Sequence, residues 1–276
     1  MKSVSKLQYL IIGSSVVLFV LLFIANKKPE KKAVEETPGQ PKAEATVDIK
    51  TFADAQISVM SDSLKKAYGE LQKNANDTAG LNALASFFNT RGMPVPAAMY
   101  YEKKVELINT SKSWLEAGNR YFYAVRFVRD KAQAASLYQK AMSCYEKSLQ
   151  KDPANLDAKI QLASCYVEGS ADPMKGISLL KEIERTDSSN IQVQMVLGGF
   201  AVKSGQMDKA EARYQKVLKL KPDYLEAYLF LADVYEKKGD KQKTIETLEK
   251  YLSLTPDKEI REEIKKYIEQ LKKSNV

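Results

Sequence analysis

The chain contains no histidine, only two cysteines and no glycine-rich phosphate-binding loop. Histidine is the commonest general base and metal ligand in proteins, so its absence removes the most frequent catalytic chemistry. Cys144 and Cys165 lack the spacing of a metal site, and we expect two buried thiols rather than a disulfide. Gly198-Gly199 lies mid-helix and lacks the Gly-Lys-Ser/Thr sequence of a phosphate loop. The sequence therefore predicts no catalytic residue, no metal, no cofactor, and a protein that is not an enzyme.

Long runs of alternating β-branched residues are also absent, and no segment predicts a β-strand. The formal net charge is +8, yet lysine and glutamate alternate along the helical stretches. Such alternation is typical of solvated helix faces. Helical repeats that read RNA need recurring side chains at fixed positions, and the chain does not have them. An all-α protein is therefore predicted, and RNA binding is the weakest of the functions considered below.

The first feature along the chain is an uncharged apolar run from Leu7 to Ala25, after a short tail over residues 1–6. At about 1.5 Å per helical residue it approaches the roughly 30 Å thickness of a bilayer's hydrocarbon core. A cleaved signal peptide is the alternative, but the run is long for that role and ends in a poor cleavage site. We therefore predict a transmembrane anchor over residues 7–25. Its apolar residues include Leu7, Leu10, Ile11, Val17, Phe19, Leu21, Phe23 and Ile24.

Four lysines follow this anchor closely, whereas two precede it. The positive-inside rule favours repeats on the cytoplasmic side, and the opposite side stays open because Glu30 interrupts the lysines. Residues 26–50 are rich in Lys, Glu, Pro, Ala and Thr, which predicts a disordered linker. The layout favours a single-pass protein of a bacterial inner membrane, although mitochondrial outer-membrane receptors share it.

The rest of the chain is organised by a repeated helical hairpin, which is clearest over residues 225–256. Pro222 and Pro256 close successive copies, and prolines cannot continue a helix. Because one hairpin cannot bury its apolar face alone, several copies must stack. Large residues recur at helical spacing on both sides of the Gly239-Asp240 turn: Tyr228, Leu231, Tyr235, Thr244, Leu248 and Tyr251.

Five copies are in register, and helical segments are expected on either side of them. The copy over residues 111–155 is about three helical turns too long, so we expect both of its helices to be extended. At the end of the last copy, Thr255 and Pro256 are the expected N-cap and first position of a final solvating helix. The predicted segments are a capping region over 51–77, hairpins over 78–110, 111–155, 156–190, 191–224 and 225–258, and a solvating helix over 259–276.

The copies share a sequence pattern that resembles the tetratricopeptide repeat (TPR), Trp-x2-Leu-Gly-x2-Tyr followed by Ala, an aromatic residue, Ala and Pro. The resemblance extends from about Thr78 to the C-terminus, and it implies a right-handed superhelical solenoid. Small residues in the pattern let the two helices of a hairpin approach closely, and a bulky residue there would cost roughly 1–3 kcal/mol. The residues that match the pattern or serve this packing include Trp114, Gly118, Tyr121, Ala163, Gly198, Ala210, Ala232 and Tyr235.

A TPR-like array also implies a concave groove lined by the first helix of each hairpin. One subclass of the family clamps peptide carboxylates with Lys, Arg and Asn, but Leu115, Ile160 and Met195 stand at the corresponding positions here. The resemblance therefore favours an apolar groove for an amphipathic helix or extended peptide, unless the chain's own helices fill it. The candidate groove residues are Asn82, Ser86, Leu115, Asn119, Phe122, Ile160, Ser164, Met195, Gly199, Leu229 and Asp233.

The extended hairpin is a second candidate surface, because aromatic residues and arginine are enriched at interfaces. Packing between its lengthened helices is the alternative role for these side chains. They are Phe122, Tyr123, Phe127 and Val128, with Arg120, Arg126 and Arg129.

Three functions are consistent with these features. The first is a membrane-anchored scaffold or adaptor that binds a protein or peptide partner. The second is a self-assembling component of a membrane complex, and the third and weakest is an RNA-binding repeat. The lipid bilayer is an expected partner through Leu7 to Ala25.

Overall fold

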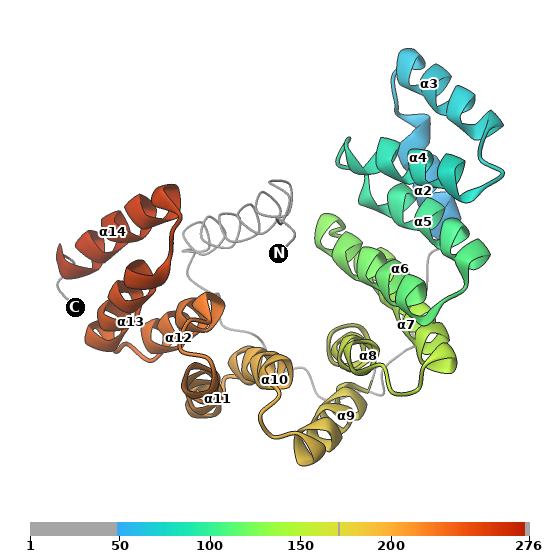
Figure 1. Cartoon of the computed structure of the whole chain (residues 1–276). Coiled ribbons are helices and arrows are strands. Elements are labelled where there is room, and N and C mark those ends of the chain that lie inside the picture. Colours follow the sequence, from blue (N-terminus) through green and yellow to red (C-terminus); the bar gives the residue numbers. More distant parts are fainter. Residues whose placement is uncertain (1–48, 171, 274–276) are drawn as a thin grey trace, which may run out of the picture. The chain divides into compact units, whose positions relative to one another are not determined.

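The computed structural model describes residues 49–170 and 172–273, and their regular structure is helical throughout (Figure 1). Within these ranges there are thirteen α-helices, one 3-10 helix and no strand, which confirms the all-α prediction. The expected anchor over residues 7–25 and nearly all of the linker over residues 26–50 lie outside the described residues. In the described ranges, no helix combines the length and the apolar character needed to cross a membrane.

The helices follow one another in pairs, and the described chain divides into two compact units within α12. One unit ends at Ala227 and the other begins at Tyr228. The helices are α2 (Ile49–Ser58), α3 (Asp62–Lys73), α4 (Thr78–Asn89), α5 (Pro94–Ile108), α6 (Ser111–Ala124), η1 (Val125–Phe127), α7 (Lys131–Lys151), α8 (Leu156–Gly169), α9 (Pro173–Thr186), α10 (Ile191–Lys203), α11 (Met207–Leu220), α12 (Leu225–Lys237), α13 (Lys241–Leu254) and α14 (Lys258–Lys273).

Local sequence signals begin and end these helices with the period of the repeat. The Asn155 side chain accepts a hydrogen bond from the backbone N–H of Ala158, and Asn190 accepts one from Val193, both at 3.0 Å. Each asparagine satisfies a backbone donor that the first turn of a helix leaves unpaired. Gly205, with a φ of +72°, lets the chain leave α10 and reach α11 within three residues. That left-handed conformation is strained for residues with a side chain, which explains the glycine.

Close approach between paired helices depends on glycines in the first helix. A Cβ atom at Gly118 would lie 2.4 Å from the Cε1 atom of Tyr145, and one at Gly198 would lie 2.6 Å from the Cε1 atom of Tyr214. Both tyrosine rings are buried. The glycines on α6 and α10 therefore make room for a tyrosine from the second helix of the same hairpin.

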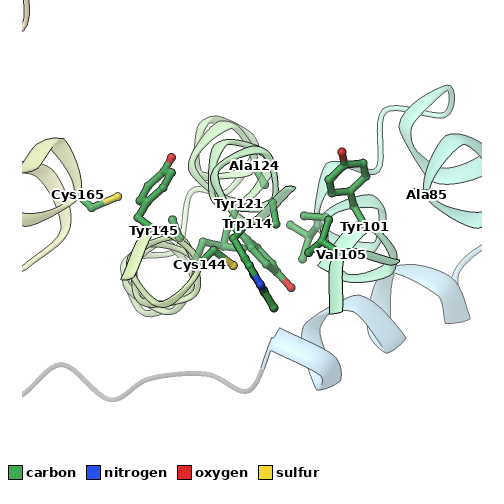
Figure 2. Close-up of a cluster of buried hydrophobic side chains, with 14 of the residues drawn as sticks. Ala85, Tyr101, Val105, Trp114, Tyr121, Ala124, Cys144, Tyr145 and Cys165 are labelled. Carbon is green, nitrogen blue, oxygen red and sulfur yellow. The ribbon is translucent and has the colours of Figure 1, made fainter. Parts of the chain in front are cut away.

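One core cluster joins residues of α4, α5, α6, α7 and α8. Trp114 and Tyr121 of α6 lie beside Cys144 of α7, while Cys165 of α8 is directed toward Tyr145 (Figure 2). Both cysteines are free thiols and fully buried. They contribute to the core as small apolar side chains.

The hairpin over residues 111–155 is longer than the others, but the expectation that both helices are extended was wrong. Helix α6 has 14 residues, the same length as α8, whereas α7 has 21. The remaining length forms η1 and a short link to α7. The link ends at Asp130, which is the N-cap of α7. Its side chain accepts a hydrogen bond from the backbone N–H of Gln133 at 2.9 Å.

Helices α2 and α3 precede the hairpins in the same unit. Helix α3 packs on α4, and α2 packs on α5 and α7, which are second helices of their hairpins. Met60, Leu64 and Tyr68 close the apolar end of the array against Phe87 and Phe88. Helices α2 and α3 therefore cover the N-terminal end of the array. Helix α2 does so from the side of the second helices, α5 and α7.

The C-terminal unit ends in α14, whose N-cap lies two residues after the expected Thr255. Asp257, not Thr255, caps this helix, because the Asp257 side chain accepts hydrogen bonds from the backbone N–H groups of Glu259 and Ile260 at 2.9 and 3.1 Å. Thr255 instead accepts a bond from the backbone of Asp257. The apolar stripe of α14 is turned inward, and its buried residues are Ile260, Ile264 and Ile268.

Candidate functional site

The candidate groove residues lie on the first helices of the hairpins, but in two separate units. The first nine belong to the unit that ends at Ala227, and the last two belong to the other unit. Helices α6 and α8 contact each other directly, and α8 and α10 share a core cluster. The residues are Asn82 and Ser86 on α4, Leu115, Asn119 and Phe122 on α6, Ile160 and Ser164 on α8, Met195 and Gly199 on α10, and Leu229 and Asp233 on α12.

Two candidates on α8 are buried and do not offer a surface to a partner. Ile160 is fully buried in a cluster with Leu180 and Val193. The Ser164 hydroxyl is also buried, and it donates a 3.0 Å hydrogen bond to the backbone carbonyl of Ile160. Ile160 packs α8 against its neighbours and Ser164 bonds within α8, so the expectation that they line an accessible groove is corrected.

Several other candidates already have partners within the chain. Asn82 accepts a hydrogen bond from Lys104 at 2.8 Å. Asn119 accepts one from the Tyr145 hydroxyl at 2.9 Å, which fixes that buried ring beside Gly118. In the C-terminal unit, the buried Asp233 forms an ion pair with Lys237 one turn later. These polar groups therefore serve the fold of the hairpins themselves.

An open hollow of about 370 Å³ lies between α7, α8 and α10. Apolar side chains and one ion pair line it, a mixture that suits a largely apolar side chain beside a few polar groups. Gly199 lies one turn before Lys203, so both belong to the same side of α10. The hollow is lined by Tyr138, Val167, Glu168, Phe200, Lys203 and Ser204.

Glu168 joins the two polar sides of this hollow. One carboxylate oxygen accepts a hydrogen bond from the Tyr138 hydroxyl at 3.1 Å, and the other lies 2.8 Å from the Lys203 ammonium group. Burial raises the pKa of Tyr138 well above its usual range, Glu168 raises it further, and Arg126 opposes the shift. The hydroxyl therefore stays protonated as a donor, and Arg126 lies within electrostatic reach of the hollow.

A cationic aromatic surface lies at the turn between α6 and α7, and it consists of Tyr123, Arg126, Phe127 and Arg129. The rings of Tyr123 and Phe127 are about half exposed, at 48% and 50%, and their centroids lie 5.0 Å apart. Arg126 lies 6.0 Å from the centroid of the Tyr123 ring. We call these four residues the arginine–aromatic surface.

The remaining side chains of the long hairpin divide between surface and packing. Phe122 meets the Tyr138 ring edge to face at a centroid distance of 5.9 Å, and Val128 is partly buried against the core. Arg120 lies over the ring of Tyr101 at 4.0 Å. Both expected roles therefore occur in this hairpin, since Tyr123 and Phe127 are exposed while Phe122, Val128 and Arg120 pack.

Neither cysteine thiol is exposed, so neither can act as a surface nucleophile. Burial raises the pKa of the Cys144 thiol to about 12 and that of Cys165 further, with smaller contributions from nearby carboxylates. Because the thiolate is the reactive form, neither side chain is activated for chemistry. Among the described residues, no cluster of three acidic or cysteine side chains has a geometry that could hold a metal ion.

Comparisons with known proteins agree with the repeat pattern. A family model described as "Tetratricopeptide repeat" matches residues 201–262. The chain is 25% identical over 146 residues to the tetratricopeptide repeat domain-containing protein PYG7, chloroplastic, of Arabidopsis thaliana. That alignment covers 50% of this chain and 46% of the relative, so the chain spans less than half the length of that protein.

Two solved structures show the same fold at low sequence identity. A tetratricopeptide repeat protein from Parabacteroides merdae has a TM-score of 0.52 and 16% identity, covering 81% of this chain and 86% of its own. A thermophilic TPR protein from Thermus thermophilus has a TM-score of 0.51 and 17% identity, covering 70% and 98%. With the all-helical hairpins, these matches show that the fold is a TPR-like solenoid.

The register of the repeat missed most of the hollow. Tyr138 belongs to a second helix, and Phe200 and Lys203 lie outside the positions that the register selected. One signal was available, since Phe200 and Ser204 are one turn apart at the end of α10. No sequence rule placed Tyr138 beside them, because its position depends on how far α7 extends.

Proposed function

We propose that this protein is a scaffold or adaptor, which binds a protein partner through the side of α7, α8 and α10 that carries the hollow. The open hollow between α7, α8 and α10 supports this proposal most directly. It combines the ring of Tyr138 and the side chain of Val167 with the Glu168–Lys203 ion pair. Such a mixture of apolar walls and few polar groups is typical of sites that accept a partner's side chain.

The proposal includes a membrane anchor over residues 7–25, which rests on the sequence alone. The uncharged apolar run there has the length of a membrane-spanning helix. An anchored scaffold would hold its partner close to the bilayer, and it needs no catalytic residue. Extraction of native membranes with alkaline carbonate tests the anchor: the full chain should stay with the membranes, and its release would contradict this part.

Gly199→Arg tests the partner-binding face. A Cβ atom at Gly199 would meet only the Tyr214 hydroxyl, at an ordinary distance of 3.9 Å, so the fold should tolerate a side chain there. The arginine would project beside Lys203 and obstruct the approach to the hollow. We expect proteins cross-linked to the wild-type chain in native membranes to be lost from Gly199→Arg, after circular dichroism has verified its fold.

A matched control separates obstruction from added charge. Glu182 is exposed on α9, a second helix, and Glu182→Arg also introduces an arginine. The control should recover the same proteins as the wild type. If Gly199→Arg also recovers them, the face is not the binding surface. If both variants and the wild type recover only copies of this chain, self-assembly replaces partner binding as the function.

A further inference from the structure

The arginine–aromatic surface carries two positive charges, on Arg126 and Arg129, and no acidic side chain of its own. Residues 120–131 read RYFYAVRFVRDK, with four cationic side chains and one acidic side chain, and the first of the cations, Arg120, pairs with Glu116 at 3.6 Å. The one acid, Asp130, accepts a hydrogen bond from the backbone of Gln133 as the cap of α7. Within the described residues, neither Arg126 nor Arg129 forms an ion pair.

Some cationic side chains elsewhere in the same unit have acidic partners. Lys140 pairs with Glu102 at 3.2 Å, and Arg213 pairs with Glu184 at 2.8 Å. The contrast matters because a guanidinium group presents several donors in a planar fork, which fits a carboxylate by two parallel hydrogen bonds. Exposed Arg126 and Arg129 therefore offer two such forks to carboxylates from outside the chain.

Two exposed rings accompany these guanidinium groups. Tyr123 and Phe127 are half exposed and contact each other, so they form one small apolar platform. Tyrosine, phenylalanine and arginine are among the residues that are enriched at protein interfaces. Apolar and cationic groups thus occur together, which favours a partner segment with both carboxylates and a large apolar side chain.

The hollow lies close to this surface and is concave. Phe122, the neighbour of Tyr123 in the chain, meets the ring of Tyr138 edge to face at a centroid distance of 5.9 Å, and Tyr138 lines the hollow. A peptide side chain can enter a volume of about 370 Å³ beside Val167, while its neighbours pair with the arginines. Anionic lipid headgroups could pair with the same arginines, but they present no side chain to fill the hollow. The geometry therefore favours a protein segment over a bilayer surface.

We propose that the arginine–aromatic surface and the adjoining hollow form a docking site for an acidic segment of a partner protein, which inserts one large apolar side chain. This inference rests on the proposed function, because it gives the chemistry of the partner that the scaffold binds. The η1 turn and the long α7 build this site, and the 34-residue hairpin over residues 191–224 has no counterpart of them. Insertions in helical repeats are placed in loops on one face, where binding surfaces are common.

Selection of peptides by the full chain in mild detergent tests the proposal. The probe is a phage-displayed library of random dodecapeptides. We expect the selected peptides to have a net negative charge and at least one Phe, Tyr, Leu or Ile. A representative synthetic peptide should bind the wild type more weakly as salt rises from about 0.05 M to about 0.3 M, because ions screen exposed charge pairs.

Two double variants then locate the binding site. Arg126→Gln/Arg129→Gln should weaken the synthetic peptide roughly tenfold or more, since two charge-assisted contacts are lost. Tyr123→Ser/Phe127→Ser should weaken it by a similar factor without changing the salt dependence. The matched control, Lys181→Gln/Arg185→Gln, removes two exposed charges from α9 and should leave the affinity within about twofold.

The remaining outcomes would each overturn the proposal in a distinguishable way. Selected peptides that are neutral or basic, or an affinity unchanged in the arginine variant, would refute the acidic partner but leave the scaffold function standing. Binding to phosphatidylserine vesicles that the arginine variant loses, with no acidic peptide selected, would assign the surface to the membrane. If no peptide is selected and no partner is cross-linked, both this inference and the proposed function fail.

Discussion

Two hairpins of the same unit place very different side chains at the same position of the repeat. The fourth residue of the copy over 111–155 is Trp114, and the fourth residue of the copy over 191–224 is Gln194. Trp114 is buried in the apolar cluster, with its ring nitrogen bonded to Asn109 at 3.0 Å. Gln194 is equally buried but lies in a polar network. The helices pair in a similar way in both copies.

The network around Gln194 links three helices. Its amide nitrogen donates to Glu184 of α9 at 2.9 Å, and its amide oxygen accepts from Arg213 of α11 at 2.8 Å. Arg213 also donates to Glu184. Buried polar groups are tolerated when each has a partner, and they are costly when one is missing. The comparison shows that the fourth position of the repeat must hold a buried side chain. This can be a large apolar side chain or a polar one whose hydrogen bonds are all satisfied.

The largest expected change in stability comes from truncating Trp114, the apolar residue at the fourth position of the repeat. Trp114→Ala removes a buried indole and leaves a cavity, so the free energy of unfolding should fall by roughly 3–5 kcal/mol. Urea titration followed by circular dichroism measures this value. Gln194→Ala, which removes the bridging amide, should cost less, about 1–3 kcal/mol. Equal losses in the two variants would contradict the difference drawn between the hairpins.

The next effect concerns the glycines that both hairpins use. Gly198→Ala places a methyl group against the buried Tyr214 ring, so the overpacking cost of about 1–3 kcal/mol should exceed the gain of about 1 kcal/mol in helix propensity. The neighbouring Gly199→Ala is the matched control, because its methyl group meets only an ordinary contact. It should stabilise the protein by up to about 1 kcal/mol. Thermal unfolding measures whether each variant is more or less stable than the wild type. A stability change of the same sign in both variants would refute the argument.

The pH dependence of the free energy of unfolding should distinguish the polar network around Gln194 from the apolar cluster around Trp114. Hydrogen bonding to Arg213 holds the pKa of Glu184 below its usual range. The stabilising contribution of Glu184 is therefore complete above the unfolded carboxyl pKa of about 4.3, and it is lost as the pH falls through the lower folded pKa. Glu184→Gln should cost about 1 kcal/mol at pH 7 and less at acidic pH.

The comparison variant for this measurement is Trp114→Ala, whose cost should change little between the same two pH values. Denaturant titrations at neutral and acidic pH give both differences. A cost of Glu184→Gln that stays constant, or rises, toward acidic pH would show that the ion pair does not stabilise the folded state.

The smallest effect concerns the cation above the indole. The Lys147 ammonium group lies 4.0 Å from the centroid of the Trp114 ring. Lys147→Gln should reduce the free energy of unfolding by about 0.5–1 kcal/mol, the usual range for a cation–π contact with some exposure to water. In a Trp114→Ala background, the same substitution should have almost no effect. A loss that persists there would assign the contribution of Lys147 to another contact.

Sequence reasoning was strongest where the repeat imposes one answer on every copy. The period, the prolines and the small residues predicted an all-α array of helical hairpins. Gly118 and Gly198 lie against tyrosines of the second helices, which is the close approach that small residues were expected to permit. Local packing rules suffice here, because each hairpin depends mainly on contacts with its sequence neighbours.

Sequence reasoning was weaker where one copy departs from the others. The extra residues of the long hairpin were divided between both helices, whereas α7 and η1 take them. Ile160 was placed on an accessible face, but it is fully buried. Register gives the direction of a side chain relative to its own helix, and it does not say whether a neighbouring helix covers that direction. The same limitation hid the contribution of Tyr138 to the hollow.

The amino-acid sequence by itself determined the all-helical class, the pairing of helices and the lack of histidine-based chemistry, because these follow from periodicity and composition. It also suggested Tyr123 and Phe127 as surface residues. Only the tertiary structure decided which aromatic rings are exposed, which cations lack an acidic neighbour and where a hollow opens. Those properties depend on distances between helices, which are set by the packing of many side chains together and not by any one segment.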